Sequence, residues 1–253
     1  MTKKFTVNDL GEMMLNLQSE VTEMNKKLDS FMSTVEKQRE KINELCTAVQ
    51  MQALKINQNE QQNRNECIKI IGLEADKKKQ HSQHYIKNLV FESVFKPLLQ
   101  DAVDDEDDDL LTLPDIHSLL KNAHVLPKSK KAAAEAPCPI LVRLNAVDLK
   151  PKLFKHRREF MKKNPKISFF EDLTVVNSMA LMKMRDKTST ASAWTRQGVI
   201  LFTLEEDRNE VKKIHRLKNP FSVLEKDDIA SLSVPYPVEL PDLGSRQDSE
   251  EEN

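Results

Sequence analysis

The first quarter of the chain carries a hydrophobic repeat in which apolar residues recur at alternating steps of four and three. The repeat opens at Leu10, and its other members are Met14, Leu17, Val21, Met24, Leu28, Phe31, Val35, Ile42, Leu45, Val49 and Ile56. A period of 3.5 residues sustained over about seven heptads is typical of a left-handed coiled coil. We therefore predict a coiled-coil helix over residues 8–60 and assign these side chains, here called the seam, to its oligomerisation interface.

One alternative is a single amphipathic helix that lies on its own domain, but globular helices rarely exceed about 25 residues without caps. Heptad position a is mostly β-branched, whereas position d mixes Leu, Met, Phe and Gln, so the packing rules allow either two or three strands. The polar run 58–63 is interpreted as the end of the seam.

Shorter patterns predict a sheet with helices after the seam. Runs rich in β-branched and apolar residues predict strands at 66–73, 116–126, 139–144 and 167–171. Helical spacing predicts a helix at 84–100 that stops near Pro97, and another at 148–163. The order β-α-β-β-α-β gives a four-stranded antiparallel sheet with two helices on one face and the other face open to a ligand, as in RNA-recognition modules.

The predicted fold class is therefore α+β, with a long N-terminal coiled-coil helix, an RRM-like β-α-β-β-α-β domain over 64–173 and a small α/β C-terminal domain over 174–230. The RRM-like domain would carry an acidic insertion at 101–109 and a basic loop at 127–139. The C-terminal domain would consist of a helix at 174–187, a turn into a strand over 194–203 and a last basic helix at 206–217. A disordered acidic tail is predicted over 231–253.

Composition agrees with an extended element that carries modest domains, because only 39% of the residues are hydrophobic and 31% are charged. The formal net charge of −1 hides a segregation along the chain. Residues 139–218 hold 18 Lys or Arg against 9 Asp or Glu, whereas residues 225–253 hold 9 acids and 2 bases. A basic body with an acidic tail indicates a polyanionic partner for the body.

Several classes of protein are disfavoured. Four glycines and no phosphate-loop motif argue against nucleotide enzymes. Cys46, Cys67 and Cys138 are scattered, which predicts neither disulfides nor a zinc site, and Cys67 is expected to pack as a small apolar group. No signal peptide and no stretch of about 18 apolar residues is present, so we expect a soluble intracellular protein without a membrane partner.

Catalysis is not predicted either. The carboxylates cluster at 101–109, where mutual repulsion favours solvation over a paired acid and base. His81 and His84 have a spacing that suits two metal ligands, but no further ligand set accompanies them. We expect no enzyme activity, no cofactor, no metal and no small-molecule substrate.

The layout resembles the first-open-reading-frame protein of LINE-type non-LTR retrotransposons. The resemblance is carried by the order and spacing of segments 67–73, 122–127, 140–144, 169–174 and 194–202. It implies a homotrimer that coats the element's RNA in a cytoplasmic ribonucleoprotein, with a nuclear location also open, and acts as a nucleic-acid chaperone. The family usually has Arg where Val125 stands and a basic residue where Ser168 stands, so a domesticated derivative is an alternative.

Strand parity predicts a binding face without the family, because side chains alternate between the two faces of a sheet. If Ile68, Ile70, Val142, Leu144, Ile167 and Phe169 face the helices, then Lys69, Arg143 and Phe170 share the open face together with Ser168. Cations there would meet phosphates, and a ring would stack on a base. The alternative is that Phe170 packs under the C-terminal domain and the cations are only solvated.

Further basic residues are candidates for nucleic-acid binding, each with a solvated surface as the alternative. Helix 148–163 would present Lys155, Arg157, Arg158 and Lys162, away from its apolar side at Leu149, Leu153 and Phe160. The basic loop would supply Lys128, Lys130 and Lys131. Arg196 could form a second clamp beside Trp194, although a core position is favoured for Trp194.

The leading hypothesis is an oligomeric protein that binds single-stranded RNA or DNA, with the trimer taken from the resemblance and a dimer also open. Its runner-up is a structural coiled-coil adaptor whose domains bind other proteins. A hydrolytic enzyme is a distant third.

Overall fold

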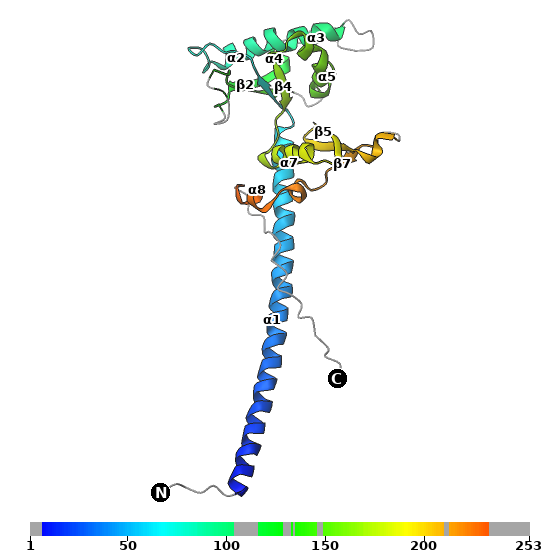
Figure 1. Ribbon diagram of the computed structural model, residues 1–253. Helices are drawn as coiled ribbons and strands as arrows, with labels where there is room; N and C mark the ends of the chain where they lie inside the picture. The colour runs from blue at the N-terminus through cyan, green and yellow to red at the C-terminus, as the bar shows by residue number, and fades with distance from the viewer. Residues whose placement is uncertain are drawn as a thin grey trace. The chain divides into compact units, whose positions relative to one another are not determined.

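The computed structural model describes residues 7–103, 116–128, 133, 135–145, 149–209 and 213–232. The chain divides into two compact units, and the boundary falls between Ala53 and Leu54. Long and short helices occur together with antiparallel sheets, so the predicted mixed α+β class with a long N-terminal helix is confirmed (Figure 1). All strands of the described residues lie after Leu54.

Helix α1 spans Val7–Arg64 and has 58 residues. The helix continues through the polar run 58–63 and ends four residues beyond the predicted bound at 60. Seam side chains are exposed within this chain, for example Met14 at 74% and Phe31 at 65%, and only Val49 is half-buried. An exposed apolar stripe of this length is compatible with a partner copy, and oligomerisation stays a prediction.

The first sheet contains four strands. They are β1 (Cys67–Ile71), β2 (Leu120–Val125), β3 (Ile140–Leu144) and β4 (Ser168–Glu171). The strand order is β2-β3-β1-β4, and every neighbouring pair is antiparallel. The strands predicted at 66–73, 139–144 and 167–171 are confirmed. The segment 116–126 contains the expected strand, β2, which follows a helical turn, α4 (Ile116–Leu119).

Helical segments cover one face of this sheet (Figure 1). They are α2 (Gln83–Val90), η1 (Phe91–Phe95), α3 (Lys96–Val103), α5 (Leu149–Lys155) and α6 (Arg157–Lys163). Buried side chains from these segments form one apolar cluster with inward strand residues such as Ile68, Val142 and Phe169. This cluster is the core that holds the sheet flat against its helices and leaves the opposite face uncovered by them.

The prediction that the helix at 84–100 stops near Pro97 is wrong. Helical structure continues through Pro97 to Val103, and the residues just before it form the π-helical segment η1. The Lys96 N–H donates to the Phe91 carbonyl five residues earlier. Because proline has no N–H and clashes with the carbonyl four residues back, a locally widened turn lets the helix accommodate it.

The single helix predicted at 148–163 is two helices. His156 separates them with φ −90° and ψ 1°, outside the α region, and its carbonyl accepts the first bond of α6 from the Phe160 N–H. Leu153 and Phe160 are buried as predicted, so both helices keep the expected apolar side toward the core.

The second sheet has three antiparallel strands in the order β5-β6-β7. These are β5 (Thr190–Arg196), β6 (Val199–Leu204) and β7 (His215–Arg216). Helix α7 (Val175–Asp186) packs on this sheet and is capped by the Thr174 hydroxyl, which accepts from the Asn177 N–H, as the predicted helix at 174–187 requires. Two short elements follow, η3 (Pro220–Val223) and α8 (Lys226–Ala230).

Two C-terminal predictions are wrong. The described part of the segment 206–217, where a helix was predicted, contains a 3₁₀ turn, η2 (Glu206–Asn209), and the strand β7. His215 bonds Asp207 at 2.9 Å and stacks on Phe202, and these contacts hold β7 on β6. The predicted turn into a strand is present at Gln197 and Gly198, before β6, but Trp194 lies ahead of this turn, within β5. The core position favoured for Trp194 is wrong, because it is half-buried and Ala193 and Ile200 occupy the core there.

Part of the acidic insertion at 101–109, Lys130 and Lys131 of the basic loop and nearly all of the tail lie outside the described residues. Among the described residues, no helix combines the length and apolarity needed to cross a bilayer. The same residues contain no group of three or more His, Cys, Asp or Glu placed to hold a metal ion.

Candidate nucleic-acid interface

The open face of the four-stranded sheet holds the residues that strand parity placed there. Ile68, Val142 and Phe169 are fully buried, whereas Arg143 and Phe170 on alternate positions are exposed. The alternation of burial agrees with the predicted parity on all three strands. Side chains on this face can therefore meet a ligand without disturbing the core.

Phe170 is the centre of the group that the structure brings together. Lys69 on β1 stands directly opposite Phe170 on β4 in the strand register. The guanidinium of Arg157, on α6, lies 4.7 Å from the centre of the Phe170 ring. Phe170 keeps 40% of its surface exposed, so it is not buried under the C-terminal segment. We call Lys69, Arg157 and Phe170 the sheet-face cluster.

Arg157 occupies an aromatic environment. Its guanidinium also lies 5.5 Å from the Phe154 ring centre and 5.7 Å from that of Phe169. Burial is the main influence on this group and lowers the pKa of Arg157; Glu171 opposes the shift, and nearby Arg185 and Arg158 add to it. Its Nε is buried and has no hydrogen-bond partner among the described residues.

Arg143 shares the face but is already engaged. Its Nε donates to the Glu66 carboxylate at 2.7 Å, and this hydrogen bond raises the pKa of Arg143. A phosphate would have to compete with that carboxylate. Lys69, by contrast, has no ion-pair partner among the described residues.

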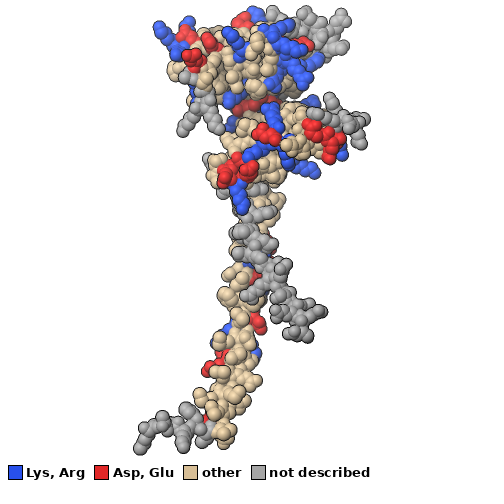
Figure 2. Space-filling view, viewed as in Figure 1, with Lys and Arg blue, Asp and Glu red and all other residues tan. Residues whose placement is uncertain are grey.

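The other predicted cations are spread more widely. Lys155, Arg158 and Lys162 are exposed on α5 and α6, Lys128 is exposed after β2, and Arg196 is exposed at the end of β5. In the view of Figure 2, basic side chains gather over the part that holds the four-stranded sheet and its helices, with fewer acidic ones among them. The structure therefore joins three candidates closely and leaves the rest as separate surface cations.

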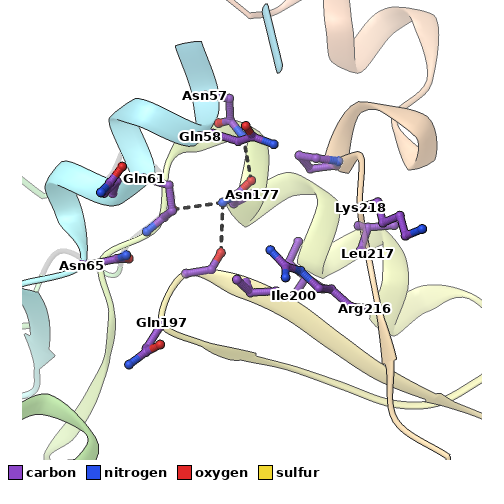
Figure 3. A pocket seen from close by; sticks show the side chains of 14 residues that line it. Asn57, Gln58, Gln61, Asn65, Asn177, Gln197, Ile200, Arg216, Leu217 and Lys218 are labelled. Atoms are coloured by element: carbon purple, nitrogen blue, oxygen red, sulfur yellow. Dashed lines mark hydrogen bonds between the residues drawn. The ribbon is translucent and has the colours of Figure 1, made fainter. Parts of the chain in front are cut away.

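A second polar region was missed by the sequence analysis. It lies where the last turns of α1 meet α7 and the β5–β6 hairpin (Figure 3). Asn57 and Gln61 are only 3% and 6% exposed, and Asn177 of α7 is buried with them. We call Asn57, Gln61 and Asn177 the amide network.

Each side-chain nitrogen and oxygen of the amide network has at least one hydrogen-bond partner. Asn57 Nδ2 donates to Asn177 Oδ1 at 2.9 Å, and the Thr174 hydroxyl donates to Asn57 Oδ1 at 2.7 Å. Gln61 Nε2 donates to the Asp172 carbonyl, and its Oε1 accepts from the Thr174 N–H and from Asn177 Nδ2. Asn177 Nδ2 also donates to the Gly198 carbonyl at 3.1 Å. Fully satisfied buried amides hold their neighbours in one arrangement.

The β5–β6 hairpin is fixed by a carboxylate as well. Glu171 of β4 accepts from the Gln197 N–H at 2.7 Å and from the Gly198 N–H at 3.0 Å. The buried Lys150 Nζ lies 3.2 Å from the same carboxylate. Both turn residues have positive φ, 52° and 75°, as a two-residue type I′ hairpin requires.

A cavity of about 410 Å³ opens beside the amide network. Side chains of α1, the hairpin turn and the segment around β7 line it, and Figure 3 shows the α1 amides on one side with Arg216 and Lys218 on the other. The sequence signal for this side of α1 was the spacing of four between Asn57 and Gln61 and between Gln58 and Gln62, which puts each amide pair on one helical face.

The seam remains exposed where the amide network grips α1. Ile56, at heptad position a, is 53% exposed, whereas Asn57 and Gln61 take positions b and f. Positions b and f lie away from the a/d stripe of a coiled coil. Contacts inside this unit therefore leave the end of the seam accessible.

Comparison with known proteins finds no family model and no curated protein that matches the chain.

Proposed function

We propose that this protein is an oligomeric single-stranded nucleic-acid-binding protein that coats RNA and acts as a chaperone for it. The observation that supports the proposal most is the sheet-face cluster, in which an exposed ring has a lysine opposite it and an arginine 4.7 Å away. Bases stack on aromatic rings irrespective of sequence, and phosphates pair with cations. The cluster offers charge and stacking, which suit binding.

The sheet itself favours the same ligand. Its order β2-β3-β1-β4, reached through the element order β-α-β-β-α-β, is the split arrangement used by RNA-recognition domains. We propose an RRM-like role for it. The resemblance to LINE first-open-reading-frame proteins adds a ribonucleoprotein of a retrotransposon, or of a domesticated derivative, as the setting, in the cytoplasm and with a trimer as the assembly.

The mechanism combines weak contacts on several copies. Each base stacked on Phe170 contributes about 1–3 kcal/mol, and each phosphate contact releases counterions, so that log K falls by about 0.7 per contact with log salt. A single cluster gives modest affinity. Copies joined through the seam would bind one strand together, and effective concentration would raise avidity about 10²-fold.

The proposal is tested by titrating the full chain with 30-nucleotide single-stranded RNA at two salt concentrations. We compare the wild type with the pair Lys69→Ala and Phe170→Ala. A matched control pair, Met182→Ala and Lys187→Ala, removes an exposed apolar and a basic side chain from α7 and its C-cap. We expect the sheet-face pair to weaken binding about 10- to 100-fold with a shallower salt slope, and the control pair to bind as the wild type does.

A structural coiled-coil adaptor is the second candidate, and one observation favours it. Arg143 is paired with Glu66, so this sheet face has one cation fewer for phosphate than parity suggested. An adaptor would bind RNA without salt dependence or not at all. Either result, or equal affinity for the two variant pairs, would replace the nucleic-acid proposal with the adaptor.

A further inference from the structure

The geometry points to a nucleotide-reading site in the cavity beside the amide network, where one base of a bound strand would be recognised by its hydrogen-bonding edge. This inference rests on the proposed function and deepens it. The sheet-face cluster holds any base by stacking, whereas the cavity has the chemistry to prefer some bases over others.

The cavity has a built floor. The amide network is buried, and each of its side-chain nitrogen and oxygen atoms has a partner within the chain. A ligand gains nothing by competing with these bonds, so the floor keeps its shape when the cavity fills. Sites held by such supporting contacts are positioned before the ligand arrives.

The rim carries unused hydrogen-bonding groups. Among the described residues, the side chains of Gln58, Gln62 and Gln197 line the cavity and form no hydrogen bond. Each primary amide offers donors and an acceptor side by side, which matches the Watson–Crick or Hoogsteen edge of a base. Two of these amides come from α1 and the third from the hairpin turn.

The positive charge of the cavity indicates that the ligand carries a phosphate beside its base. Arg216 and Lys218 line it without an ion-pair partner among the described residues, and none of the described lining residues is acidic. A guanidinium and an ammonium beside neutral amides fit a phosphate attached to a planar polar ring. That combination is one nucleotide unit.

Size and lining agree with this ligand. A volume of about 410 Å³ lies within the ~300–1,000 Å³ range of small-ligand sites. Val199, Ile200 and Leu217 supply apolar contact, and no aromatic ring is among the described residues of the lining. Without a stacking platform, the base would be held by its edge, and edge contacts distinguish bases.

Oligomerisation through the seam would leave the cavity accessible. Gln58 lies at heptad position c, and the seam residue Ile56 stays exposed beside it. Each copy in an oligomer would therefore keep its own cavity, and several sites would read along one strand.

The test compares binding of 30-nucleotide poly-U, poly-A and poly-C RNA to the full chain. Gln58→Trp fills the cavity from an exposed helix position, Arg216→Ala removes the rim cation, and Lys187→Ala is the control for charge. We expect the wild type and the control to prefer one base by about tenfold. Both cavity variants should lose that preference while retaining salt-dependent binding through the sheet-face cluster.

A second measurement separates a nucleotide site from an anion site. The backbone amide signal of Gly198 is followed by NMR during titration with uridine, adenosine and cytidine monophosphates and with inorganic phosphate. A larger shift with one nucleotide than with phosphate supports the inference, and an equal shift with phosphate overturns it. Equal binding of the three polymers by the wild type, or an unchanged preference in both variants, also overturns it. Wild type that binds no RNA at all would instead refute the proposed function on which the site rests.

Discussion

The two sides of helix α1 reverse the usual distribution of polar and apolar residues. Along the seam, large apolar side chains such as Leu28 and Phe31 are exposed within the chain. In the last turns, the amides Asn57 and Gln61 are buried and hydrogen-bonded within the chain. On the face of α1 seen in Figure 2, most of the described surface is neither basic nor acidic.

The amide side of α1 finds its partners within the same chain, whereas the seam does not. The amides are paired inside the same chain, with residues 111 to 120 positions away. The seam residues gain no such burial here, although each could contribute about 1.5–3 kcal/mol if covered. A helix that places amides against its own fold and leaves its apolar stripe outside fits a stalk built from several copies.

Breaking the seam should have the largest effect. Leu28→Asp with Val35→Asp puts two charges at position a, and burying unpaired charges in a coiled coil is prohibitive. We expect light scattering at micromolar concentration to fall to the monomer mass of 29.1 kDa, with about 10²-fold weaker binding of 30-nucleotide RNA. Ser33→Asp, at position f, should keep the wild-type mass. A wild type that is already monomeric would contradict the seam.

Replacing Asn by Leu at two positions of α1, two residues apart, should have opposite effects on stability. Asn57→Leu removes a buried donor and a buried acceptor, so Asn177 Oδ1 loses its donor and the Thr174 hydroxyl loses its acceptor, which costs about 2–4 kcal/mol of unfolding free energy. Asn59→Leu adds an apolar side chain at position d, where Asn is exposed, and should stabilise the oligomer. Urea unfolding measures both. Equal effects would show that the two sides do not differ.

Alanine substitutions at Gly198 and Gly11 test the amide network and the exposed part of α1, with a smaller expected change in stability. Gly198 has φ 75°, and an added Cβ would lie 2.5 Å from Gln61 Cγ, so Gly198→Ala should cost about 2 kcal/mol by straining the turn and shifting a network amide. Gly11 is inside α1 with nothing within 4 Å of an added Cβ, and Gly11→Ala should stabilise by about 1 kcal/mol. Thermal unfolding of both variants checks the signs. Unchanged stability in Gly198→Ala would argue against a tight contact at Gln61.

Features determined by local sequence patterns could be predicted, whereas features determined by distant contacts could not. Patterns that repeat locally were sufficient for α1, for β1, β3 and β4, and for α7, because period and caps are written within each segment. Parity also placed Lys69 and Phe170 on one face correctly. These features need no knowledge of distant residues.

Features decided by distant residues were missed or wrong. The burial of Asn57 and Gln61 was missed because their partners near the start of α7 are more than 100 positions away. The basic segment 206–217 has helical composition, yet Phe202 and Asp207 hold His215 in a strand. The stacking of Arg157 on Phe170 and the pairing of Arg143 with Glu66, 77 positions apart, are also tertiary. Local propensity yields to such contacts.

The smallest expected effect concerns Arg143 on the open sheet face, whose guanidinium is paired with Glu66. Glu66→Gln would release Arg143 from a charged partner, and the freed guanidinium could then bind a phosphate. We expect about threefold tighter RNA binding and a salt slope steeper by about 0.7, the value for one added contact. Glu74→Gln makes the same charge change at an exposed position without a partner among the described residues, and should change affinity less with no change in slope. Identical slopes for the two variants would mean that Arg143 stays outside the binding face even when it is free.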